Sequence, residues 1–79
     1  MGIAKSEKEI AERAARFLKA ELKRANVTYE ELAVRLREHG VEETRDSIAA
    51  KLKRGTFAAT FLIACIAALE LTGINLEDI

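Results

Sequence analysis

The stretch Thr44-Arg-Asp-Ser-Ile-Ala-Ala-Lys-Leu-Lys-Arg-Gly-Thr-Phe-Ala-Ala-Thr-Phe-Leu-Ile-Ala-Cys-Ile-Ala-Ala-Leu69 decides the fold of this chain. Residues 44–54 are short and basic, whereas residues 57–69 contain no charged side chain. Gly55 separates the two parts, and glycine favours the end of a helix because it adopts left-handed backbone angles at little cost. The stretch therefore predicts a cationic helix over about 45–54, followed by an apolar helix over about 58–71.

The residues before this stretch predict two further helices. Ser6-Glu-Lys-Glu9 and Thr28-Tyr-Glu-Glu31 both have the capping-box pattern, and apolar residues recur at helical spacing behind each. Asn26 and Gly40 suit the left-handed position that ends a helix. We therefore expect helices over about 7–25 and 28–39. For the apolar helix, Thr56 is the expected N-cap and Gly73 the expected stop.

Composition favours one small all-α domain over residues 1–79. The chain has no proline and is rich in helix formers, with 49% hydrophobic and 33% charged residues. A short final turn after Asn75 would make a fifth helix, so we expect four to five helices.

The same composition excludes several functions and locations. One cysteine and one histidine supply neither an internal disulfide nor a metal site, and no nucleophile and base are spaced for catalysis. We expect no enzyme activity, no cofactor, no metal and no small-molecule substrate. The longest uncharged run, residues 55–69, is too short to span a membrane, and residues 1–6 lack a secretion signal. These features predict a cytoplasmic protein.

Charge is distributed in blocks although the formal net charge is zero. Residues 1–26 carry seven basic and four acidic side chains, and residues 44–69 carry four and one. Residues 27–43 carry two basic and five acidic side chains, and residues 70–79 carry three acidic ones. Local fields therefore matter more than the sum, and the block at 44–69 is the favoured surface for a polyanion.

The segment Thr28-Tyr-Glu-Glu-Leu-Ala-Val-Arg-Leu36 resembles the T-Q-x-x-L-A-x-x-L signature of lambda-repressor-like (Xre-type) helix-turn-helix domains. The resemblance covers about residues 15–79 and implies a DNA-binding fold in which residues 45–54 form the recognition helix. Tyr29 stands where that family has glutamine, and the turn before residue 45 is longer than the family's. The phrase Lys53-Arg-Gly-Thr-Phe-Ala-Ala-Thr-Phe-Leu62 resembles a family of short bacterial proteins known only as a domain of unknown function.

These features predict a dimeric DNA-binding transcriptional regulator. In helix-turn-helix proteins the second helix enters the major groove. Base edges would be approached by Arg45, Ser47, Ala49, Ala50 and Lys53, and phosphates would be held by Tyr29, Lys51 and Arg54.

The apolar helix points large side chains in more than one direction, so one small subunit has too little surface to cover them. We expect a second copy to cover its outer side. The residues predicted at this homodimer interface are Phe57, Phe61, Leu62, Cys65, Ile66 and Leu69. An alternative stays open, in which the scaffold is a protein-interaction module without DNA binding; Asp46 and the acidic residues of 27–43 favour it.

Overall fold

The computed structural model describes residues 6–79, which form four α-helices, one 3-10 turn and no strand. The helices are α1 (Glu7–Ala25), α2 (Tyr29–Glu38), α3 (Arg45–Arg54) and α4 (Ala59–Ala68), followed by η1 (Leu76–Asp78). The predicted all-α fold is confirmed. The expected lack of a secretion signal concerns residues 1–6, of which 1–5 lie outside the described part.

The first three helices begin at the predicted N-caps. The Glu31 carboxylate, however, pairs with Arg35 and does not complete the predicted capping box with Thr28, whereas a reciprocal capping box forms between Thr44 and Ser47. Ser6, Thr28 and Thr44 each accept a hydrogen bond from the backbone N–H three residues later, at 3.1, 3.1 and 3.0 Å. These bonds satisfy N–H groups that have no partner within the helix. Because Thr28 and His39 are caps and not helical residues, α2 is one residue shorter at each end than the predicted 28–39.

Three helices end in the same motif. Asn26, Gly40 and Glu70 have positive φ, and the apolar residue after each returns its N–H to a carbonyl five residues earlier. This double reversal is a Schellman motif. Val27, Val41 and Leu71, the three apolar residues, all lie against the core. The helix ends thus supply part of the hydrophobic packing.

The predicted bounds of α4 are corrected at both ends. The N-cap is Ala58, without a side-chain hydrogen bond, because the Thr56 hydroxyl accepts from Arg54 instead. The helix ends at Ala68, three residues before the predicted end, because Glu70 adopts the left-handed conformation (φ 60°) that was expected of Gly73.

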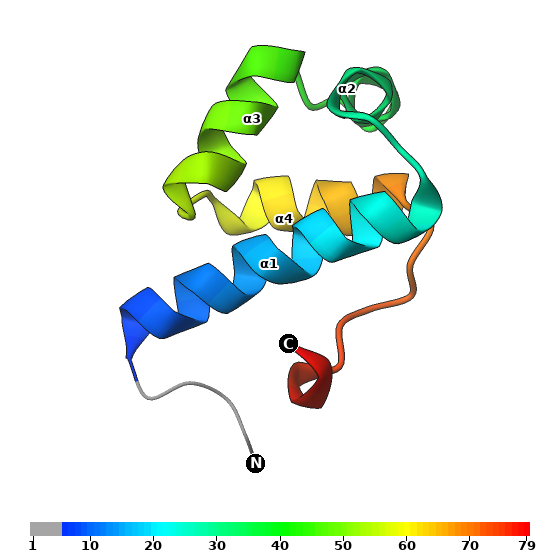
Figure 1. Ribbon diagram of the computed structural model, residues 1–79. Coiled ribbons are helices and arrows are strands. Elements are labelled where there is room, and N and C mark those ends of the chain that lie inside the picture. The colour runs from blue at the N-terminus through cyan, green and yellow to red at the C-terminus, as the bar shows by residue number, and fades with distance from the viewer. Residues whose placement is uncertain (1–5) are drawn as a thin grey trace.

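The core is apolar throughout the described residues. Its fully buried large side chains are Leu18, Leu32, Leu36, Ile48 and Leu52, with Cys65 beside them. In Figure 1, α2 is seen nearly along its axis while α3 lies across the view, so the two helices cross steeply, with α4 beneath both. α3 packs against α2 and α1, and α2 packs against α4.

The chain after α4 crosses to the other side of α1 and ends in η1, where Asn75 caps the turn as predicted (Figure 1). Within residues 6–79, no helix combines the length and the apolar character needed to cross a membrane.

Candidate nucleic-acid interface

One side of α3 is buried and the opposite side is in solvent. Ile48 and Leu52 are 0% and 1% exposed, which anchors the helix in the core. Positions 46, 50 and 53 follow the i, i+4, i+7 spacing of a single helix face and lie on the opposite side. Asp46, Ala50 and Lys53 are all exposed. We call these three residues the α3 ridge.

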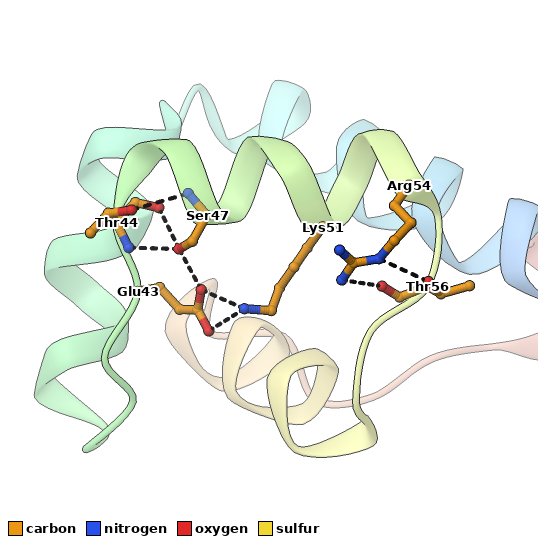
Figure 2. Close-up of polar contacts among 6 residues, drawn as sticks. All are labelled: Glu43, Thr44, Ser47, Lys51, Arg54 and Thr56. Carbon is orange, nitrogen blue, oxygen red and sulfur yellow. Dashed lines mark hydrogen bonds and ion pairs between the residues drawn. The ribbon is translucent and has the colours of Figure 1, made fainter.

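Two arginines flank the α3 ridge. Arg45 is exposed and donates from Nη1 to the Asp46 carboxylate at 3.3 Å. Arg54, at the other end of the helix, donates from Nε to the Thr56 hydroxyl at 3.1 Å and from Nη2 to the Thr56 carbonyl at 3.2 Å (Figure 2). Arg45 is therefore held only by a solvent-exposed ion pair, whereas Arg54 braces the turn between α3 and α4.

Ser47 and Lys51 do not belong to the ridge. The Lys51 ammonium donates to both oxygens of Glu43 at 2.8 Å, and the Ser47 hydroxyl donates to the same carboxylate at 2.6 Å (Figure 2). The side chains of Lys51 and Glu43 are only 26% and 10% exposed. We name these three residues the Glu43 clamp. Because Glu43 holds both side chains, Ser47 and Lys51 are less available to DNA than the ridge residues are.

The Glu43 clamp connects three parts of the molecule. Glu43 comes from the six-residue turn 39–44, Ser47 and Lys51 come from α3, and the Lys51 ammonium lies 5.4 Å from the ring centroid of Phe61 in α4. Burial alone would raise the pKa of Glu43, but the hydrogen bonds from Lys51 and Ser47 and the charge of Lys51 outweigh it and lower that pKa. The carboxylate therefore stays ionised and pairs with Lys51 at neutral pH.

The remaining predicted DNA contacts are less exposed than the ridge. Tyr29 is half-buried at the start of α2 and packs against the core, and Ala49 is half-buried beside the ridge. The structure thus brings Arg45, Ala50, Lys53 and Arg54 to one exposed helix and places Tyr29 on another.

The six residues of the predicted dimer interface divide into two groups. Phe61, Cys65 and Leu69 are 3%, 0% and 9% exposed within the single subunit, so the prediction that a second copy covers them is corrected. They belong to the same core cluster as the buried residues of α2 and α3, whereas Phe57, Leu62 and Ile66 are only half-buried. Beside them Ile63, which the sequence analysis did not select, is 65% exposed.

Burial also explains the chemistry of Cys65. Removal from water, and secondarily the negative charge of Glu43, raise the pKa of its thiol to about 12. The thiol is therefore protonated at neutral pH and serves as a small apolar side chain.

Glu43 was not among the site residues predicted from the sequence, and no contact role was predicted for Asp46. Glu43, Ser47 and Lys51 recur at four-residue intervals, a spacing that places side chains on one face when the turn before a helix continues its path. That spacing was the available signal for the Glu43 clamp.

One cavity among the described residues lies away from α3. It has a volume of about 600 Å³ and lies between α1 and the chain after Leu71. Arg24 in its wall is paired with Glu21, and Arg13 donates to the main-chain oxygen of Ile79 at 3.0 Å. Over residues 6–79, no three His, Cys, Asp or Glu side chains are grouped so that they could hold a metal ion.

Comparison with known proteins gives a family without an assigned activity. A family model described as a domain of unknown function (DUF6471) matches residues 10–74. Neither the curated proteins nor the solved structures contain a significant match. The matched segment runs from the first turn of α1 to the residues just before η1, and therefore includes all but the ends of the fold. The chain belongs to this family, the DUF6471 domain of unknown function.

Proposed function

We propose that this protein binds double-stranded DNA through the α3 ridge and acts as a dimeric transcriptional regulator. The observation that carries the proposal is the position of α3. The helix is anchored by Ile48 and Leu52, crosses α2 steeply, and leaves its opposite side in solvent (Figure 1). A helix presented in this way fits the major groove of DNA, which is wide enough to admit one α-helix.

The exposed side chains of α3 are compatible with its insertion into the major groove. Ala50 is exposed at the middle of the helix, so the backbone can come close to the base pairs. Arg45, Lys53 and Arg54 are exposed near the two ends, where they can reach phosphates. Because Lys51 is neutralised by Glu43, we count three phosphate contacts per subunit, which corresponds to a salt slope of about −3.

The dimer is supported by the outer side of α4. Ile63 is 65% exposed, Leu62 and Ile66 are half-buried, and the exposed Ala59 and Ala67 lie beside them. We call Ala59, Leu62, Ile63, Ile66 and Ala67 the α4 face. No charged residue occurs between Arg54 and Glu70, so two copies of this face can pack without burying a charge. A two-fold dimer would present two α3 helices to a palindromic site.

The test is fluorescence anisotropy of labelled duplexes at low and moderate salt. We expect binding at low salt, where phosphate contacts are strongest, and a loss of affinity as salt rises. Lys53→Ala should weaken binding several-fold and reduce the magnitude of the salt slope by about 1 for each bound subunit.

The matched control is Lys23→Ala, which removes the same charge from an exposed position on α1. Equal weakening by both variants would show a general charge effect and reject α3 as the contact helix. Absence of wild-type binding at low salt would reject DNA binding altogether.

One observation favours a second function, that of a protein-interaction module. The Glu43 clamp cancels the charge of Lys51, and Asp46 stands on the exposed ridge, which lowers the attraction for phosphates. The α4 face would then be the main contact surface. If the protein does not bind DNA at low salt but still self-associates through Ile63, this second function is supported.

A further inference from the structure

We propose that Asp46 is a specificity-determining residue that accepts a hydrogen bond from the exocyclic amine of a cytosine in the major groove. This inference rests on the proposed function and deepens it, because it names the base that the α3 ridge selects. A carboxylate on a DNA-contacting surface repels phosphates, so Asp46 must offset that repulsion by another contact.

The carboxylate of Asp46 lies almost entirely in solvent. Its side chain is 92% exposed, and among the described residues it accepts a hydrogen bond from Arg45 alone, at 3.3 Å. An exposed ion pair of this kind is worth little and is screened by salt, so it separates at small cost. Asp46 is therefore free to take another donor when a ligand covers the ridge.

The neighbours of Asp46 favour close approach at this point. Ala50, one turn later on the same face, is exposed and small, and Ala49 beside it is half-buried. The longer Ser47 and Lys51 side chains are held by Glu43 in the Glu43 clamp. Asp46 lies in the first turn of α3, and it is the N-terminal residues of a recognition helix that contact base edges.

Hydrogen-bond chemistry then selects the base. An ionised carboxylate only accepts hydrogen bonds. The major-groove edges of guanine and thymine offer acceptors and a methyl group, whereas cytosine offers its N4 amine as a donor without an adjacent acceptor. Adenine pairs its N6 donor with the N7 acceptor, which would face the second carboxylate oxygen. Cytosine is thus the base for which Asp46 is complementary.

A purely structural role for Asp46 makes a different prediction. A carboxylate in the first turn of a helix interacts favourably with the helix dipole, and that effect is independent of any DNA sequence. If Asp46 served only the helix, its replacement would alter stability but would leave sequence preference unchanged.

The experiment is selection of binding sites from a randomised duplex pool by the full chain, followed by sequencing of the bound fraction. Wild-type protein should select a site with cytosine at one position of each half-site, preferred over other bases by roughly tenfold. Asp46→Ala should lose that preference and bind random duplexes several-fold more tightly, because a repulsive charge is removed. Asp46→Asn should change the preferred base at the same position to adenine, since asparagine pairs with the N6 and N7 groups.

Glu42→Gln is the matched control, because it removes an exposed carboxylate next to α3 but off the ridge. It should raise non-specific affinity and leave the selected site unchanged. Circular dichroism of each variant shows whether it is folded, and Asp46→Asn preserves side-chain size if the alanine variant is unstable.

The outcomes separate this inference from the function on which it rests. If wild-type protein binds duplexes but the Asp46 variants select the same site, or if no site is selected, Asp46 does not determine specificity while DNA binding stands. If wild-type protein binds no duplex at low salt, both fail together.

Discussion

At the scale of the residue, Glu43 is the side chain that joins the turn before α3 to the helix itself. It lies in the turn 39–44, which is longer than the three or four residues usual between the helices of a helix-turn-helix unit. A longer turn leaves more freedom in the placement of the following helix. The bonds from Glu43 to Ser47 and Lys51 remove that freedom, because they fix the end of the turn to the first two turns of α3.

Removing the negative charge of Glu43 should destabilise the fold. Glu43→Gln loses charge-assisted hydrogen bonds from Lys51 and Ser47, and we expect a cost of about 1–3 kcal/mol in the free energy of unfolding. Urea denaturation at neutral pH measures this cost. Glu42→Gln, which changes an exposed neighbour, should alter stability by less than about 0.5 kcal/mol. Equal effects of the two variants would contradict the clamp.

Because the Glu43 carboxylate titrates, we expect the stability of the fold to depend on pH. The pKa of Glu43 is lowered in the folded protein, so its contribution to stability is present above 4.5, the ordinary value, and is lost as the pH falls through the lowered folded pKa. The difference in stability between wild type and Glu43→Gln should therefore be constant near neutral pH and shrink below about pH 5. Urea titrations at several pH values test this, and a difference that does not change in acid would argue against ion pairing.

Replacing Glu70, in contrast, should stabilise the fold. It is a non-glycine residue at φ 60°, a conformation that costs an ordinary side chain about 1 kcal/mol. Glu70→Gly should therefore stabilise the protein by about that amount and raise the Tm by several degrees. Glu70→Ala keeps the Cβ atom in the same conformation and should bring no such gain. A thermal melt in which both variants behave alike would show that backbone conformation is not the cause.

The end of α4 at Glu70 could not be predicted from residue type. Asn26 and Gly40 were predicted as helix ends because their residue types tolerate positive φ, and both have it. Glu70 has no such preference, and the nearby Gly73 was the better candidate by residue type alone. The position is determined by Leu71, whose packing against the core requires the chain to reverse one residue earlier.

At the scale of the element, the four helices were predictable and their contacts were not. Periodicity and capping residues are local, which is why α1 and α3 have the predicted bounds. The orientation of a side chain off the buried stripe depends on what lies next to the helix. Lys51 was expected to face DNA because its residue type is basic, but Glu43 and Phe61 draw it inward. Similarly, Phe61 and Cys65 were expected at a dimer interface, but α2 and α3 leave room for them in the core.

The outer side of α3 makes a prediction that belongs to the helix as a whole. Ala50→Leu places a larger side chain at the middle of the α3 ridge, where nothing in the subunit packs against it. We expect DNA affinity to fall at least tenfold, because the helix can no longer approach the groove closely, while stability changes by less than about 0.5 kcal/mol. Anisotropy and urea denaturation measure the two quantities. Ala25→Leu, an exposed alanine at the end of α1, should change neither.

At the scale of the whole molecule, the fold separates two surfaces of different character. The α3 ridge has a charged residue at each end, Asp46 and Lys53, and the small Ala50 between them. The α4 face carries no charge. One subunit covers Phe61, Cys65 and Leu69 by itself but leaves Ile63 largely in water. A second copy on the α4 face would therefore complete the burial of α4 without rearranging the core.

This arrangement predicts a dimer that one substitution can disrupt. Ile63→Glu places a charge at the centre of the α4 face, where pairing of two copies would bury it at high cost. We expect sedimentation at micromolar concentration to give twice the 8.7 kDa subunit mass for wild type and a single subunit for this variant.

Val34→Glu is the matched control, since Val34 is also an exposed large apolar residue, 51% exposed, but lies on α2. It should sediment as wild type does. Because Ile63 is 65% exposed in the single subunit, the Ile63→Glu monomer should remain folded and bind one half-site more weakly than wild type binds a palindrome. A wild-type chain that sediments as a single subunit would remove the dimer from the proposed function, and α3 would then have to bind DNA alone.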